Sequence, residues 1–185
     1  MTEKQRDILI VENQDCPVCF QPKAVFSEYE SEDPYVGPIV IFAIKCNACG
    51  FKNSDIELVN PGTPAEYKID IEGKDDLDIR IIKNGSCQIK IPNFRIDVDS
   101  SMNSEGFISN VEGLLLRFKR QIYLLKDGED DKAKRKKIKT ILSGIDEVLA
   151  GEKKITIKLI DDTGNSAIVS DKVEIKKIKP KKSLD

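Results

Sequence analysis

The sequence contains no histidine and no tryptophan, and only 6% of its residues are aromatic. The absence of histidine excludes catalysis by a Ser–His or Cys–His pair. It also means that a zinc site in this chain would have to be built from sulfur ligands. The sequence shows no P-loop, no Gly-x-Ser-x-Gly motif and no Rossmann fingerprint. We therefore expect a protein that is not an enzyme.

Long apolar runs and an excess of one charge are also missing. The 185 residues include 30 lysines and arginines and 32 acidic residues, for a net charge of −2. This balance gives the whole chain no strong attraction to nucleic acid or to an anionic membrane. No apolar run approaches the roughly 20 residues of a transmembrane helix, and residues 1–7 lack the apolar region of a signal peptide. We expect a soluble, cytoplasmic protein with no membrane partner.

Four of the five cysteines form two Cys-x-x-Cys pairs, Cys16 with Cys19 and Cys46 with Cys49. Four thiolates in this arrangement can close a tetrahedral shell around one zinc ion. Disulfide bonds are an alternative, but they would leave Cys87 unpaired in a chain without a secretory signal. A thioredoxin-like redox pair is a second alternative, but it needs a single pair at a helix start in a βαβ unit. We predict one structural Zn²⁺ bound by the four paired cysteines, and Cys87 as a small buried residue.

Proline and glycine divide the chain into two modules. Residues 1–60 are typical of a zinc ribbon, with two strands expected between the cysteine pairs. The segment Asn-Pro-Gly-Thr-Pro at residues 60–64 marks the expected boundary. We expect a second module over residues 61–179 and a basic tail over residues 180–185.

Apolar residues alternate with polar ones from residue 67 to residue 98, which is typical of strands with one wet face. The apolar positions that share a face fall into four groups: Tyr67, Ile69 and Ile71; Leu77, Ile79 and Ile81; Ile89 and Ile91; Phe94, Ile96 and Val98. Further strands are expected at residues 155–160, 167–169 and 173–175. The chain is therefore predicted to be mainly β.

Residues 109–151, between these β regions, have the apolar period of two amphipathic helices. Ser109 and Glu112 match a capping box at the start of the first helix, and Gly151 is typical of the end of the second. The first apolar face comprises Val111, Leu114, Leu115, Phe118, Ile122 and Leu125. The second comprises Ile138, Ile141, Leu142, Ile145, Val148 and Leu149. We predict a helical hairpin inserted into the β module.

Two further segments each allow a functional and a plainer interpretation. Asp162-Thr163-Gly164 matches half of an aspartic-protease site, which would require a homodimer, but the same residues favour a β-turn. Residues 132–139 hold six lysines and arginines. They form either a phosphate-binding patch or the solvated start of a helix. We favour the helix, because no aromatic residues interleave to stack on bases.

Several segments, taken in order, resemble the ZPR-one zinc-finger family. Residues 46–55 resemble the second zinc knuckle of the family, and residues 106–114 resemble its segment ending in Val-Glu-Gly-[Ile/Leu]. Residues 161–166 are similar to its Asp-Pro-Ala-Gly-Asn-Ser segment, which removes the need for a protease motif. Shorter matches lie at residues 76–83 and 91–94. One departure is Phe20, which follows the first cysteine pair where the family has glycine.

The resemblance implies both a fold and a function. The expected fold is a four-Cys zinc ribbon followed by a β-helix-like double-stranded β domain that carries the helical hairpin, in the archaeal single-module form. The expected function is a non-enzymatic adaptor or folding chaperone for the translation elongation factor 1-alpha homologue. The residues implied to contact this partner are Phe51, Lys52, Asn53, Gly164, Asn165 and Ser166.

Two alternatives to this expectation stay open. The first concerns Phe51, which could instead pack the ribbon onto the β domain. The second concerns function: a zinc-ribbon accessory factor could bind nucleic acid through residues 132–139 and the basic tail.

Overall fold

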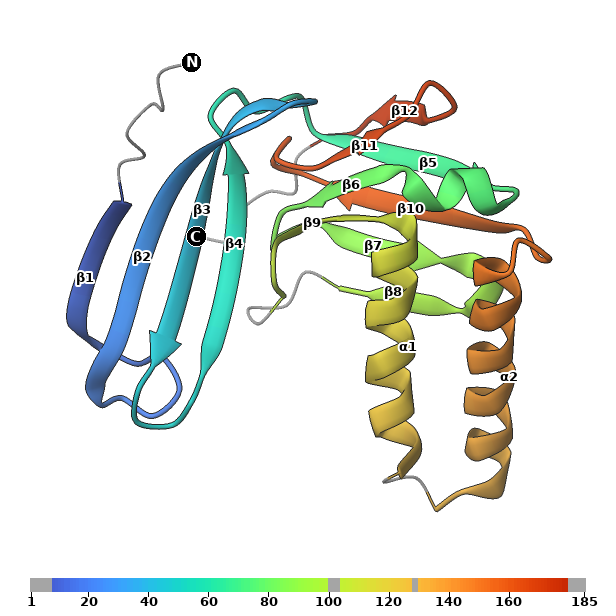
Figure 1. Ribbon diagram of the computed structural model, residues 1–185, viewed down its shortest axis with the longest axis horizontal. Helices are drawn as coiled ribbons and strands as arrows, with labels where there is room; N and C mark the ends of the chain where they lie inside the picture. The colour runs from blue at the N-terminus through green and yellow to red at the C-terminus, as the bar shows by residue number, and fades with distance from the viewer. Residues whose placement is uncertain (1–7, 100–103, 128–129, 180–185) are drawn as a thin grey trace.

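The computed structural model describes residues 8–99, 104–127 and 130–179. The basic tail predicted at residues 180–185 lies outside the described residues. Figure 1 shows a four-stranded sheet at one side of the molecule, a β domain beside it, and two helices that extend away from the β domain. The chain is mainly β with a helical insertion, as predicted.

The four-stranded sheet is an antiparallel meander in the order β1-β2-β3-β4. Its strands are β1 (Ile8–Asp15), β2 (Pro22–Asp33), β3 (Gly37–Cys46) and β4 (Lys52–Leu58). The connections from β1 to β2 and from β3 to β4 each carry one Cys-x-x-Cys pair. Both connections lie at the same end of the sheet, because Ala24 near the start of β2 pairs with Cys46 at the end of β3. The antiparallel register therefore brings the two cysteine pairs together.

The β domain contains two further sheets. The five-stranded sheet has the order β12-β5-β10-β7-β8, and the three-stranded sheet has the order β11-β6-β9. The strands are β5 (Ala65–Ile71), β6 (Arg80–Lys83), β7 (Gln88–Ile91), β8 (Ile96–Val98), β9 (Phe107–Asn110), β10 (Ile155–Asp161), β11 (Ala167–Val169) and β12 (Glu174–Lys177). Because β10 and β5 are far apart in sequence yet paired along their whole length, the sheet closes only when the chain returns from the helical insertion.

The main hydrophobic core lies in the β domain. Alternate side chains of β5 and β10 are buried, as a period of two predicts. Cys87 belongs to this core and is fully buried, as predicted. Within the described chain, this core contains no residue of β1–β4. The four-stranded sheet must therefore be held together in another way.

Two apolar residues predicted in strands lie in short 3₁₀ helices instead. Leu77 belongs to η1 (Lys74–Asp78) and Phe94 belongs to η2 (Pro92–Phe94). The Asp76 side chain accepts a hydrogen bond from the backbone N–H four residues earlier, which closes a turn around η1. A proline begins η2, and proline is favoured in the first turn of a helix. Both apolar side chains are nevertheless buried, so the alternation predicted the burial correctly and the local backbone wrongly.

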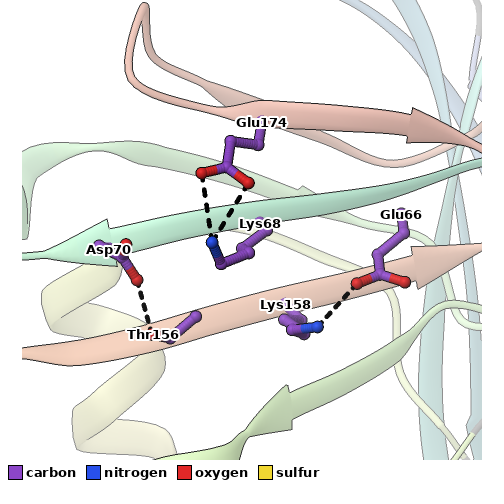
Figure 2. A network of polar contacts seen from close by, with 6 residues as sticks. All are labelled: Glu66, Lys68, Asp70, Thr156, Lys158 and Glu174. Carbon is purple, nitrogen blue, oxygen red and sulfur yellow. Dashed lines mark hydrogen bonds and ion pairs between the residues drawn. The ribbon is translucent and has the colours of Figure 1, made fainter.

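The outer face of the five-stranded sheet is polar, and Figure 2 shows how its charges pair across the strands. Lys68 and Lys158 lie directly opposite each other, an arrangement in which like charges repel. Each lysine has its own carboxylate: Lys68 contacts Glu174 at 3.2 Å, and Lys158 contacts Glu66 at 2.9 Å. Such pairs each contribute about 0.2–1 kcal/mol. They balance the charge on a sheet face that is open to water.

The predicted helical hairpin consists of α1 (Val111–Asp127) and α2 (Lys132–Leu149). The residues of the two helices that are buried in the core are Val111, Leu114, Leu115, Phe118, Ile145 and Val148. Leu125 was placed on the same face by its spacing but is 67% exposed. Both helices extend beyond the β domain (Figure 1), so their far ends have no sheet to pack against.

The N-cap of α1 differs from the sequence prediction. Ser109 lies in β9, opposite Ile81, and the Gly113 N–H donates a hydrogen bond to Asn110 Oδ1 at 2.8 Å. Asn110 is therefore the N-cap, one residue later than the capping box predicts. The strand displaces the cap, because β9 stays paired with β6 up to Asn110. Asparagine caps a helix as well as serine does.

This assignment predicts different effects for two neighbouring substitutions. Asn110→Ala is expected to lower the free energy of unfolding by about 1 kcal/mol, because it removes the side-chain acceptor of the cap. Ser109→Ala removes no cap and is expected to change it by less than about 0.5 kcal/mol. Urea denaturation of both variants measures the difference. A larger loss in Ser109→Ala than in Asn110→Ala would show that the capping box is used after all.

Candidate metal centre

The four paired cysteines meet at one end of the four-stranded sheet. Their Sγ atoms all lie within 4.8 Å of one another. The Cys16 and Cys49 sulfurs are 3.7 Å apart, as are the Cys19 and Cys46 sulfurs. Four sulfurs bound to a tetrahedral zinc ion at about 2.3 Å would be about 3.8 Å from one another. The cluster therefore fits one zinc ion with four sulfur ligands and no open coordination position.

Both cysteine pairs form the same tight turn. The Phe20 N–H donates to the Cys16 carbonyl at 2.9 Å, and the Gly50 N–H donates to the Cys46 carbonyl at 3.1 Å. Gly50 has a φ of 77° and Phe20 a φ of 58°, a left-handed conformation that suits glycine and strains a residue with a Cβ. The first knuckle therefore keeps the geometry of the second, although phenylalanine stands at the position where the second knuckle has Gly50.

Backbone N–H groups point at the sulfurs within each turn. The Val18 N–H donates to Cys16 Sγ at 3.4 Å, and the Ala48 N–H donates to Cys46 Sγ at 3.3 Å. Hydrogen bonds from the backbone of Cys49 and Ala48 lower the pKa of the Cys46 thiol to about 6. These hydrogen bonds therefore favour the thiolate form of Cys46, which is the form that binds a metal ion.

The Cys19 thiol titrates in the opposite direction. A backbone hydrogen bond from Gln21 lowers its pKa, but burial and the three neighbouring sulfurs outweigh that effect and raise the pKa to about 12. In such a cluster the first negative charge opposes the formation of the next. A zinc ion removes this opposition, so its binding deprotonates the remaining thiols and releases protons.

The aromatic residues of the two knuckles lie differently. Phe51 is half-buried and packs against the cysteine cluster. It therefore supports the metal centre from within the ribbon. Phe20, in contrast, is 79% exposed. Sequence reasoning did not select Phe20 as an exposed aromatic residue, although its position directly after a cysteine pair was the signal that could have identified it.

Lys52 and Asn53 open β4 directly after the second knuckle. They point to opposite faces of the sheet, because neighbouring residues of a strand alternate. Lys52 is exposed, whereas Asn53 is half-buried. The Oδ1 atom of Asn53 is buried and accepts no hydrogen bond from the described part of the chain.

Gly164, Asn165 and Ser166 lie where the four-stranded sheet meets the β domain. The Leu58 N–H donates to Asn165 Oδ1 at 3.1 Å, and the Gly62 N–H donates to the Gly164 carbonyl at 2.8 Å. Gly164 has a φ of 81°, and a Cβ at this position would overlap the carbonyl group of Gly62. Ser166 is buried. Asn165 therefore joins the β domain to β4 directly, Gly164 contacts the segment that connects the two parts, and Ser166 lies beside them within the β domain.

A second set of contacts at the same junction was missed by sequence reasoning. Asp55 Oδ1 accepts hydrogen bonds from the Gly85 N–H at 2.6 Å and from Asn84 Nδ2 at 3.3 Å. Asn84 Nδ2 also donates to the Ile56 carbonyl at 2.7 Å, and the Asn84 N–H donates to Ser166 Oγ at 3.0 Å. Asp55 ends the segment that resembles the second knuckle, and this position was the available signal.

One ion pair also crosses the junction. Asp33 at the end of β2 contacts Arg80 of β6 at 2.5 Å, and the Asp33 side chain is 1% exposed. Burial alone would raise the pKa of Asp33. Hydrogen bonds from the backbone of Tyr35 and Val36, together with the Arg80 guanidinium, outweigh burial and hold the pKa below its usual value.

The lowered pKa of Asp33 predicts a pH-dependent contribution to stability. The contribution is fully present above the unfolded-state pKa of about 3.9, and it is lost as the pH falls through the lower folded-state pKa. Asp33→Asn is expected to lower the free energy of unfolding by about 1–3 kcal/mol near neutral pH. Glu32→Gln, which changes the exposed neighbour, serves as the control. Urea denaturation at a series of pH values from 7 down to 2 measures the free energy of unfolding of wild type and of Asp33→Asn. The difference between the two should shrink as the pH falls. A difference that stays constant with pH would contradict the assignment.

The two remaining candidate segments have the structures that their non-functional interpretations predict, a helix start and a bend. Residues 132–139 form the first turns of α2, with their basic side chains exposed. The Asp131 carboxylate caps this helix by accepting from the Ala133 N–H at 2.7 Å. The residues after β10 form a bend, in which the Thr163 N–H donates to Asp161 Oδ1 at 2.9 Å. No helix in the described ranges is long and apolar enough to cross a membrane.

A family model for the ZPR1 jelly-roll domain matches residues 75–182 of this chain. An uncharacterized ZPR1-like protein of Pyrococcus horikoshii is 32% identical over 170 residues, which cover 89% of this chain and 75% of the relative. A ZPR1-like protein of Methanocaldococcus jannaschii is 32% identical over 165 residues, which cover 89% of this chain and 83% of the relative. The zinc finger chaperone zpr1 of Schizosaccharomyces pombe is 24% identical over 139 residues, which cover 73% of this chain and 30% of the relative.

The chain combines a four-sulfur zinc site on a β-ribbon with a jelly-roll domain that carries a helical hairpin. These features define a zinc-finger protein with a jelly-roll domain. The chain belongs to the ZPR1 family. This confirms the resemblance drawn from residues 46–55, 106–114 and 161–166, the expected mainly β fold and the zinc cofactor. The β domain that follows the ribbon is a jelly-roll domain of this family. The chain spans about a third of the fission yeast relative, so much of that protein has no counterpart in it.

Proposed function

We propose that this protein is a non-enzymatic, cytoplasmic folding chaperone or adaptor for the translation elongation factor 1-alpha homologue of its own cell. Membership of the ZPR1 family supports this proposal, as does the relative named a zinc finger chaperone. We propose the elongation factor as the partner because the second knuckle and residues 161–166 resemble those of the family. Charge and hydrophobic periodicity do not identify the partner.

The observation that carries the proposal is the closed four-sulfur cluster. A zinc ion with four sulfur ligands has no position left for a substrate, so its role is to hold the two knuckles in one shape. The contacts of Asp55 and Asn165 then fix the ribbon against the β domain. Such an arrangement offers a preorganised recognition surface, which favours binding because little entropy is lost on association.

The proposed contact residues divide into two groups by position. Phe51, Lys52 and Asn53 lie at or directly after the second knuckle, and Phe20 adds an exposed aromatic ring at the first. Gly164, Asn165 and Ser166 are engaged at the junction, so we propose that they act on partner binding by positioning the ribbon. Aromatic residues supply much of the binding energy of small interfaces, which makes Phe51 and Phe20 the residues to test first.

Isothermal titration calorimetry with the purified elongation factor homologue, in its GDP and GTP states, tests the proposal. Wild type is expected to bind in at least one state. Phe20→Ala should weaken binding by about 2 kcal/mol if the ring is a main contact, while keeping the zinc ion and the thermal midpoint, because Phe20 is exposed. Phe51→Ala should also weaken binding, and a loss of zinc or of thermal stability in this variant would assign Phe51 a packing role instead, because its ring packs against the cysteine cluster. Tyr123→Ala removes an exposed aromatic ring on α1 and serves as the control. Absence of binding heat in both states would overturn the proposal.

The exposed basic start of α2 favours one alternative function, a nucleic-acid-binding accessory factor. Binding through residues 132–139 would weaken steeply with salt, because each phosphate contact releases counterions. A titration of RNA at increasing ionic strength distinguishes the two functions. Tight RNA binding at physiological salt, together with no binding of the elongation factor, would replace the adaptor proposal by this one.

A further inference from the structure

One face of the four-stranded sheet combines apolar and acidic side chains. The pairing register places Val11, Phe26, Ile44 and Asn53 in one row across the four strands, and Leu9, Glu28, Phe42 and Asp55 in the next. Glu30, Val40 and Glu57 form a third row on the same face. We call this surface the acidic-apolar face.

The apolar part of this face is hollowed and open to water. A cavity of about 280 Å³ is lined by side chains that include Leu9, Val11, Phe26, Phe42 and Ile44. Three of these apolar residues are strongly exposed: Leu9 at 59%, Val11 at 40% and Phe26 at 42%. Contiguous exposed apolar surface on a soluble protein marks an interaction site more often than chance. Asn53, whose Oδ1 accepts no hydrogen bond from the described residues, lies in the wall of the same hollow.

The charges on this face have one sign. None of the four strands contributes a lysine or an arginine to it, whereas Lys23, Lys45 and Lys52 belong to the opposite face. Within the described ranges, no cation pairs with Glu28, Glu30 or Glu57. Unpaired carboxylates beside a low-dielectric apolar surface attract positive charge. The partner that fits this face therefore carries both apolar and basic side chains.

The edge strand of the same sheet, β1, can accept an added strand. β1 is the outer strand of the sheet and lies on the side away from the β domain (Figure 1). Residues 8–11 pair regularly with β2 and contain neither a charge nor a proline, the usual protections of a sheet edge. The irregularity that could disrupt pairing comes later, between Val11 and Gln14, where Asn13 has a φ of 58°.

We propose that this edge and the acidic-apolar face bind an extended segment of another protein, added as a strand beside β1. Its backbone would hydrogen-bond to β1, as in other cases of β-augmentation. Its apolar side chains would fill the hollow beside Leu9 and Val11. A lysine or arginine on the added strand would reach Glu28 across two strand spacings, about 9.6 Å. The inference goes beyond the proposed function, because it concerns the chemistry of the bound segment whichever protein supplies it.

Fluorescence anisotropy with a defined probe tests this site on the zinc-loaded chain. The probe is a fluorescein-labelled extended peptide of valine, leucine and lysine, compared with the same peptide carrying glutamate in place of lysine. The lysine peptide is expected to bind at least about tenfold more tightly than the glutamate peptide, with an affinity that falls as salt rises. Equal or undetectable binding of both peptides to wild type would overturn the proposal.

Matched variants locate the binding. Glu28→Lys and Val11→Asp are each expected to weaken binding of the lysine peptide by about tenfold or more, while the zinc content stays that of wild type. Glu152→Lys makes the same charge change at an exposed position after α2 and should bind like wild type. Unchanged binding in both Glu28→Lys and Val11→Asp would contradict the assigned surface. A dimer in light scattering that Val11→Asp converts to a monomer would also overturn it, because a second copy would then occupy this edge.

Discussion

Replacing Cys46 with serine is expected to remove the zinc ion and to unfold the four-stranded sheet. The sheet has only a small cluster to hold its zinc-binding end: among the described residues, this cluster consists of Cys16, Ala24 and Cys46, with Cys19, Ile44 and Phe51 packed against it. The main hydrophobic core of the described chain contains no residue of β1–β4. In small metal modules the binding free energy of zinc, about 10–16 kcal/mol, is effectively folding free energy. Loss of one of the four ligands should therefore abolish zinc binding and, with it, the folding of the four-stranded sheet.

Elemental analysis and amide hydrogen exchange measure the two parts of this prediction. Wild type should contain one zinc ion per chain and the Cys46→Ser variant essentially none. Amides of β1–β4 should lose their protection in the variant, while those of β5 and β10 keep theirs, because the core of the β domain does not use the metal ion. Cys87→Ser is the matched control, since Cys87 is buried in that core and lies outside the sulfur cluster. Full zinc retention in Cys46→Ser would refute the ligand assignment.

Leu115→Asp is expected to have the second large effect. Leu115 lies in α1, is fully buried and belongs to the main core. An aspartate there would place a charge among apolar side chains without a partner, which is strongly unfavourable. We expect a loss of about 4 kcal/mol or more, a large fraction of the roughly 5–15 kcal/mol that stabilises a typical domain. The variant should be partly or wholly unfolded at 37 °C.

The next residue in the helix provides the control. Leu116 is 46% exposed, so Leu116→Asp makes the same chemical change with the same change in helix propensity but no burial of charge. It should alter the free energy of unfolding by no more than about 0.5 kcal/mol. Urea denaturation followed by circular dichroism compares the two. Similar midpoints for both variants would mean that α1 does not face the core as described.

The elements that depend on local spacing could be predicted from the sequence. The Cys-x-x-Cys spacing places two sulfurs on one tight turn, and an antiparallel hairpin then brings two turns together. The period of two in β5 and β10 predicted which side chains are buried. The apolar spacing of 109–151 predicted both helices, because burial of a helix face repeats every three to four residues.

The features that the sequence did not predict depend on contacts between residues that are far apart in the sequence. Ser109 and Asn110 are both good caps, and only the pairing of β9 with β6 decides between them. Asp55 and Asn84 lie 29 residues apart in sequence, so nothing local shows that they meet. The acidic-apolar face was also hidden, because it requires the exact register of the four strands. The contact role predicted for Gly164, Asn165 and Ser166 stays a prediction.

X-ray absorption spectroscopy at the zinc edge tests the central claim of this account most directly. The claim is that Cys16, Cys19, Cys46 and Cys49 hold one zinc ion in a closed, structural site. The spectrum should then show four sulfur neighbours at about 2.3 Å and no oxygen or nitrogen in the first coordination shell. A shell of three or fewer sulfurs completed by a lighter atom at about 2.0–2.1 Å would contradict it, because the site would then have an open position and a role beyond holding the ribbon.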